Sequence, residues 1–216
     1  MKVMKKTVFA SMGIFAMALG GCSSAPKHES DWIVDRFDDI KVIRYEVPGF
    51  ENLPLNEKVL VYYLAEAAKC GRDILFDQNF KYNLAIRRAL EQIYTNYDGD
   101  RSDADFVAME KYLKKVWFAN GIHHHYSNDK FSPEFSREWF AAQLAACNVE
   151  CPVPAEELVE VIFNPDLYAS KLDQTAGIDM VKASAVNFYD GVTEAEVQDF
   201  YKKMASVNDP RPISYG

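Results

Sequence analysis

The sequence has little positive charge and no basic run beyond its N-terminus. Among 216 residues, 24 Lys and Arg stand against 32 Asp and Glu, so the formal net charge is −8. A protein that binds nucleic acid has to meet the phosphate backbone with clustered positive charge. We therefore expect no nucleic acid among the partners of this protein.

The sequence also lacks the short motifs of common enzyme classes. It has no G-x-S-x-G, no glycine-rich phosphate loop and no G-x-G-x-x-G after a strand. Histidine occurs only at His28 and in the run 123–125. Consecutive side chains diverge by about 100° on a helix and alternate faces on a strand, so at most His123 and His125 could share a metal. With no H-E-x-x-H spacing, we expect a polar loop with one or two hydrogen-bonded histidines and no metal site.

Cysteine is scarce, and no C-x-x-C occurs, so neither a thioredoxin-type motif nor a zinc ribbon is indicated. Beyond Cys22 there are three cysteines: Cys70, Cys147 and Cys151. Cys147 and Cys151 could pair if the helix that carries Cys147 ends before Cys151, as Pro152 suggests. The alternative is three buried free thiols, and the sequence leaves both open.

The N-terminus has the pattern of an export signal. Three lysines precede an uncharged apolar stretch, residues 7–19, which is shorter than the ~20 apolar residues that a membrane span needs. It ends in Leu-Gly-Gly-Cys at 19–22, which resembles a bacterial lipobox. We expect a signal peptide over residues 1–21, a lipidated tether over 22–30 beginning at acylated Cys22, and a folded body over 31–216. The alternative is an ordinary secretory signal with a chance cysteine.

Acylation of Cys22 would make the lipid bilayer a partner of the chain. The expected location is outside the cytoplasm, anchored to a bacterial membrane on its periplasmic or outer-membrane face.

The rest of the sequence predicts a mainly α fold with a small β element. Alternation of apolar and polar residues predicts one strand, over 43–47, before Pro48 and Gly49 end it. Apolar residues at helical spacing predict the remaining elements, over residues 55–70, 86–97, 103–120, 132–144, 154–163, 179–189 and 193–204.

Several of these helices have recognisable ends. Gly71 follows the first helix where a left-handed residue commonly ends one. Ser102 or Asp103 can cap the third, and Ser132 followed by Pro133 can open the fourth. Thr193 and Glu196 have the spacing of a capping box for the last.

Three long segments resemble the N-terminal part of bacterial dipeptidyl peptidase III. They read Ile-Arg-Tyr-Glu-Val-Pro-Gly-Phe at 43–50, Gly-Arg-Asp-Ile-Leu-Phe-Asp-Gln-Asn at 71–79 and Trp-Phe-Ala-Asn-Gly-Ile-His-His-His-Tyr at 117–126. They occur in the order that the family has, and the similarity runs from about residue 31 to residue 216.

The resemblance implies part of a zinc peptidase. Members of that family are two-lobed exopeptidases that release dipeptides from the N-termini of short peptides, and they carry zinc on an H-E-x-x-x-H helix followed by an E-E-x-R type motif. Neither motif is present here, since Glu156-Glu157-Leu158-Val159 lacks the arginine. The resemblance thus implies the N-terminal lobe portion of the two-lobed fold, truncated at its C-terminus. We expect this chain alone to hold no zinc and to have no catalytic residue.

The same resemblance indicates where substrate would be bound. The segment 120–126 is similar to a family segment that lines the cleft between the lobes, where an aromatic ring packs against the substrate. Tyr126 is the first expected substrate contact, and Asn120 and His125 follow it. Alternatively, Tyr126 is an ordinary core or interface aromatic. A rival interpretation of the whole chain is a non-enzymatic helical lipoprotein that binds a partner protein or peptide.

Overall fold

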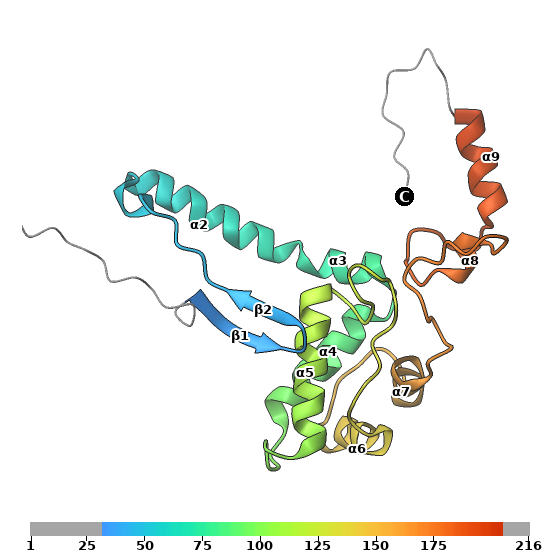
Figure 1. Ribbon diagram of the computed structural model, residues 1–216, viewed down its shortest axis with the longest axis horizontal. Coiled ribbons are helices and arrows are strands. Elements are labelled where there is room, and N and C mark those ends of the chain that lie inside the picture. The colour runs from blue at the N-terminus through green and yellow to red at the C-terminus, as the bar shows by residue number, and fades with distance from the viewer. Residues whose placement is uncertain (1–31, 205–216) are drawn as a thin grey trace, which may run out of the picture. The chain divides into compact units, whose positions relative to one another are not determined.

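The computed structural model describes residues 32–204 (Figure 1). The expected signal peptide, Cys22 and the tether lie outside the described residues. The described part is mainly helical with one two-stranded sheet, which confirms the expected mainly α character. The chain divides into two compact units, one with residues 32–36 and 41–45 of the described part and the other with 37–40 and 46–204.

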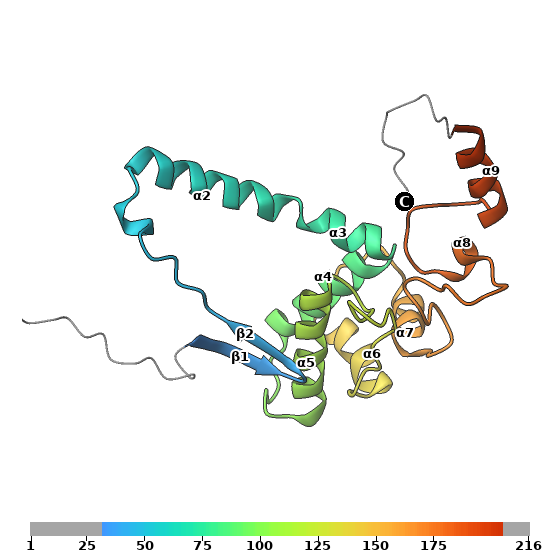
Figure 2. The ribbon, with the colours of Figure 1, turned by 45° about the horizontal axis from the view of Figure 1, so that its top comes forward.

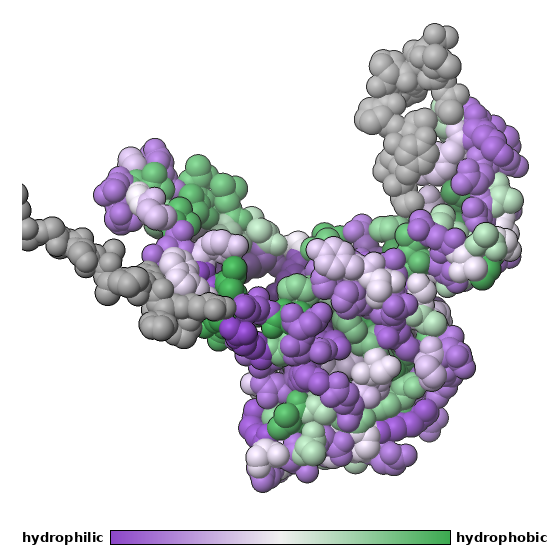
Figure 3. Space-filling model, viewed as in Figure 1, coloured by the Kyte–Doolittle hydropathy of each residue, from purple (hydrophilic) through white to green (hydrophobic). Residues whose placement is uncertain are grey.

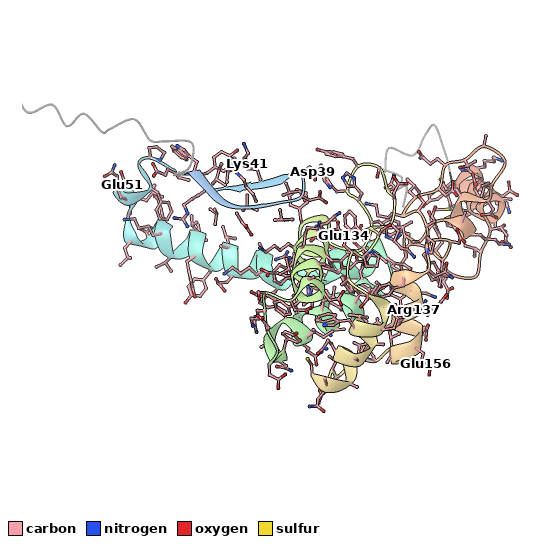
Figure 4. All side chains as sticks on the ribbon, turned by 60° about the horizontal axis from the view of Figure 1, so that its bottom comes forward. Asp39, Lys41, Glu51, Glu134, Arg137 and Glu156 are labelled. Carbon is pink, nitrogen blue, oxygen red and sulfur yellow. The ribbon has the colours of Figure 1, made fainter. Side chains whose placement is uncertain are left out.

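The sheet is a hairpin of β1 (Ile33–Phe37) and β2 (Ile40–Ile43). The two-residue turn between the strands contains Asp39, labelled in Figure 4, and joins them as an antiparallel pair. The predicted strand over 43–47 is wrong, because residues 44–47 lie beyond the end of β2. Alternation alone does not make a strand; a pairing segment is needed, and the hairpin places it earlier in the chain.

A single helical turn, η1 (Phe50–Asn52), leads into α2 (Leu55–Cys70), which has the predicted bounds. Gly71 is right-handed, with φ −78° and ψ −6°, so the expected left-handed end is wrong. The reason is that α3 (Arg72–Asn79), which the sequence analysis missed, begins directly after it.

The apolar side chains of α2 are exposed, with no residue of the helix buried. Figure 3 shows hydrophobic residues gathered over this helix. Large side chains along it are 44% to 77% exposed. Contiguous exposed apolar surface of this kind commonly marks an interaction site. Neither α2 nor any other described helix has the combination of length and hydropathy that crossing a membrane requires.

The core lies around α4 (Asn83–Asn96) and α5 (Ala104–Ala119), which lie side by side in Figures 1 and 2. The predicted stripe of α4 is buried, as Ile86, Leu90 and Ile93 have no exposed surface. The Asp103 side chain caps α5 by accepting the backbone N–H groups of its first turn. Both helices therefore agree with their sequence signals, although α4 begins three residues before the predicted 86.

The next pair is α6 (Arg137–Ala146) and α7 (Ala155–Phe163). Arg137, labelled in Figure 4, pairs with Glu160 of α7 at 2.7 Å. The predicted start of α6 at Ser132 is wrong, because Ser136 is the cap, with its Oγ accepting from the helix at 3.3 Å. Asp105 on α5 selects this cap by accepting the Ser136 N–H at 2.6 Å.

The described chain ends with α8 (Met180–Ala183) and α9 (Glu194–Met204). The predicted helix over 179–189 is wrong beyond its first turn, because the N–H groups of Ala185 and Val186 bond to the 170–171 segment instead of continuing a helix. The predicted capping box of α9 is confirmed: Thr193 N donates to Glu196 at 2.8 Å, and Glu196 N donates to Thr193 Oγ1 at 3.2 Å.

The three cysteines within the described residues are free. Cys147 is buried, and burial raises the pKa of its thiol. Although α6 ends at Ala146 and so before Cys151, which was the condition for a disulfide, Cys147 and Cys151 form none. Cys70 is exposed at the end of α2, so the alternative of three buried thiols is also wrong.

Candidate functional site

The loop that the resemblance singled out begins at the end of α5. Asn120 ends the helix in the left-handed region, with φ 54° and ψ 41°. Short polar Asn tolerates that conformation better than other residues with a side chain. The N–H of Gly121 then donates to Val116 O at 3.0 Å, which satisfies a carbonyl of the last helical turn. The chain leaves α5 in a fixed direction as a result.

The side chains of two asparagines, Asn79 and Asn83, hold the backbone where it leaves α5. Asn83, which is fully buried at the start of α4, accepts the N–H of Ile122 at 3.0 Å. Asn79 donates to Asn120 O at 3.2 Å, and Asn83 donates to the same oxygen at 3.4 Å. Gly121 has a φ of +153°. A Cβ added to it would lie 2.1 Å from the side-chain amide nitrogen of Asn83. Glycine is therefore required for this close approach.

Beyond Ile122 the chain turns back on itself. Phe131 N donates to Ile122 O at 2.8 Å, and His124 N donates to Asp129 O at 2.8 Å. Asn128 adopts φ 66° in the returning arm. These hydrogen bonds fix a hairpin-like loop with residues 125–127 at its tip. The backbone that carries the tip side chains is therefore held in place.

His123 lies inside the molecule, with 2% of its surface exposed. Its Nε2 is 2.8 Å from Tyr168 O, which can only accept, so the proton of the neutral ring is on Nε2. Its Nδ1 is buried and has no partner. Burial lowers the pKa of His123 to about 4. His123 is thus a neutral structural side chain at pH 7.

His124 and His125 stack on each other, with ring centroids 4.5 Å apart. The expectation that at most His123 and His125 could share a metal concerned ligand geometry, and this stack of rings does not contradict it. That expectation assumed a helix or a strand, whereas the chain turns here. The rings of Phe118, on α5, and His125 form a T-shaped pair with centroids 4.9 Å apart. The centroids of the Tyr126 and His125 rings are 4.3 Å apart.

Tyr126 is 84% exposed, at the tip of the loop. Its N–H donates to His124 Nδ1 at 3.2 Å, so its backbone is held while its ring is presented to solvent. Within the described residues Tyr126 is therefore not a core aromatic. Of the three predicted contacts, His125 and Tyr126 lie together, whereas Asn120 lies at the base of the loop and acts through its backbone.

The histidines of this loop do not fit a zinc site. No group of three or more His, Cys, Asp or Glu among the described residues is placed to hold a metal ion. His123 Nε2 is engaged by Tyr168 O, and His124 Nδ1 accepts from the N–H groups of Tyr126 and Ser127, each at 3.2 Å. Zinc needs ligand lone pairs that converge, and the histidines of this loop do not provide such a set.

The residues that support the loop were not predictable from the sequence patterns considered above. Asn83 and Phe118 were not singled out, although they fix its base and its inner ring. The pair Asn120-Gly121 was the signal in the sequence that could have indicated this support. A glycine that follows a left-handed residue at a helix end often marks a place where another group approaches the backbone closely.

Comparison with known proteins adds no relative: no family model matches this chain, and no curated protein matches it significantly.

Proposed function

We propose that this chain supplies the N-terminal lobe portion of a lipid-anchored, two-lobed zinc dipeptidyl peptidase that releases dipeptides from short peptides. The proposal rests on the three ordered segments at 43–50, 71–79 and 117–126. The zinc and its ligands would come from residues outside this chain. The part of this chain is to bind and orient the peptide.

The single observation that supports this role best is the presentation of Tyr126. Tyr126 presents an 84% exposed aromatic ring on a loop whose backbone is held by hydrogen bonds, so the ring is accessible to a peptide side chain. The histidine stack beneath it, with Phe118 behind, limits the positions that the ring can adopt. A ring that is held in place in advance loses little conformational entropy when it packs against a peptide side chain.

The test is Tyr126→Ala in the enzyme assembled with its zinc-bearing lobe. The ring would contact substrate equally in ground and transition states, so KM should rise while kcat stays nearly constant. The expected loss of affinity is about 1–3 kcal/mol, the scale of burying a large apolar side chain.

Two variants control this test. Tyr126→Phe should cost little, because the ring makes the contact. Tyr62→Ala, on α2 and 59% exposed, should leave KM unchanged. A folded, zinc-loaded Tyr126→Ala enzyme with unaltered KM on several peptides would show that Tyr126 does not contact substrate as the resemblance implies.

A second candidate function, a non-enzymatic lipoprotein that binds a partner protein or peptide, is favoured by α2. Isolated helices shorter than about 12–15 residues are marginal in water and longer ones gain most of their stability from packing, yet α2 buries none of its residues. A photocrosslinker placed at Leu60 in cells should give an adduct with another protein, while one at exposed Glu156 on α7 should give none. Failure of the Leu60 crosslinker to give a specific adduct would argue against this function.

A further inference from the structure

We propose that a cavity beside α8 binds a small carboxylate that carries an apolar, aromatic-sized group. The cavity has a volume of about 330 Å³, within the range of about 300–1,000 Å³ that is usual for small-molecule sites. Residues 171–172, α8 and residues 186–189 line most of it. This inference does not depend on the peptidase proposal.

The cavity wall is formed by chain segments that hydrogen bonds hold together. Lys171 N donates to Asn128 O at 2.8 Å, and Val186 N donates to Lys171 O at 3.1 Å. Asn187 N reaches Gln78 O on α3 at 3.0 Å. Because four separate segments of the chain are joined by backbone hydrogen bonds, the cavity is preformed, and a ligand need not order its walls.

Most of the lining is apolar. The residues that supply it are Leu172, Met180, Val181, Val186, Phe188 and Tyr189. The two aromatic rings among them favour an aromatic ligand group through offset or edge-to-face contacts. An apolar group that enters this space leaves water, which is the favourable term for its binding.

Among the described residues that line the cavity, Lys171 alone is charged, and it is half-buried. No ion pair joins it to a carboxylate within the part of the chain that the structure describes. Five acidic side chains adjoin the lining residues in the chain or bond to them. Asp173, Asp179 and Glu194 each accept a backbone N–H, and Asp129 and Asp190 form no ion pair with Lys171 within the described residues. The ammonium group of Lys171 is therefore available to an anion.

Polar groups in the lining can hold the second oxygen of a carboxylate. Ser184 Oγ accepts the N–H of Asp173 at 2.9 Å, which leaves its O–H to donate to a ligand oxygen. One cation and one hydroxyl against an apolar wall match a monoanion with an apolar body. The same chemistry is presented by a free arylalkanoic acid and by a peptide whose C-terminal residue is apolar.

The test uses 3-phenylpropionate and its neutral amide as probes of the purified protein. Binding is followed by two-dimensional ¹H–¹⁵N NMR spectra. The acid should give saturable shifts centred on the amides of Leu172, Val181 and Val186, and the amide should bind more weakly. The tripeptide Ala-Ala-Phe and its C-terminal amide distinguish the two sources, since tighter binding of the tripeptide acid than of 3-phenylpropionate identifies a peptide C-terminus, and weaker binding identifies a free acid.

Three variants separate charge from shape. Lys171→Gln should weaken binding of the acid by about tenfold, the scale of a charge-assisted hydrogen bond in a partly buried site, and leave the neutral amide unaffected. Lys182→Gln, an exposed lysine of α8 outside the lining, should change neither. Val181→Phe, which fills the cavity, should weaken both.

Three results would overturn the proposal. They are an absence of saturable shifts, equal affinity for the acid and its amide in the unaltered protein, and shifts that centre on α2 instead of the cavity. An effect of Lys182→Gln as large as that of Lys171→Gln would show that only general charge matters.

Discussion

Mild acid should destabilise the fold through His123. The unfolded chain has a histidine pKa of 6.5, whereas burial lowers the pKa of His123 in the folded protein to about 4. Between these values the unfolded state binds more protons, so stability falls as pH falls through this window. The physical cause is visible in the structure: a proton on Nδ1 would be buried without an acceptor, beside the Phe80 ring at 5.5 Å.

The difference of pKa sets the magnitude. The loss of unfolding free energy is about 3 kcal/mol at a pH low enough to protonate His123 in both states, and about 2 kcal/mol at pH 5. Nearby charges act in both directions on the pKa, since Lys130 and Lys171 lower it and Asp129 raises it. Desolvation is the largest cause, so the effect should persist at high salt.

Urea unfolding at pH 7 and pH 5, followed by tryptophan fluorescence, measures this loss. His123→Gln keeps an amide that can donate to Tyr168 O but cannot titrate, so its loss of stability should be smaller by about 2 kcal/mol. His125→Gln is the matched control and should behave as the unaltered protein. Equal losses in the protein and in His123→Gln would refute the reasoning.

Three further predictions concern other parts of the chain. The Lys130 ammonium donates to the carbonyls of Val161, Asn164 and Leu167 at the end of α7, so Lys130→Met should lower the free energy of unfolding by about 2–5 kcal/mol in urea titrations, and Lys182→Met should not. Gly121→Ala should cost about 1–3 kcal/mol in the same assay, because the added Cβ collides with Asn83; an unchanged stability would show that the loop base yields easily. Cys22→Ser should move the protein from the membrane to the soluble fraction, because acyl chains supply the anchoring; a variant that still pellets, with no lipid found on the unaltered protein by mass spectrometry, would contradict it.

Helices with local signals were predictable from the sequence. The bounds of α2 and the caps of α5 and α9 follow from apolar spacing and from side chains one turn away, Asp103 and Thr193. These contacts involve residues close in sequence, so the pattern contains the cause of the structure.

Elements that depend on distant residues were not predictable. The start of α6 is one example: Ser132 and Ser136 both suit a cap, and only Asp105, 31 residues away, favours Ser136. The hairpin was missed for a different reason: the alternation at 43–47 fits a strand, but the pairing is local and joins 33–37 to 40–43.

The candidate site shows the same division. The end of α5 at Asn120 and Gly121 was predictable from the sequence. The stack of His124 on His125 was not, since a turn brings neighbouring side chains together in a way that neither the helical nor the strand period describes. The cavity at Lys171 could not have been predicted either, because its walls come from four separate segments.

The central proposal, that this chain is the N-terminal portion of a zinc dipeptidyl peptidase, is tested most directly by sequencing the DNA that follows the codon of Gly216 in its native locus. Our account predicts a continuation, in frame or shifted, that encodes H-E-x-x-x-H and then an E-E-x-R type motif. A downstream region that encodes neither motif in any of its reading frames would contradict it.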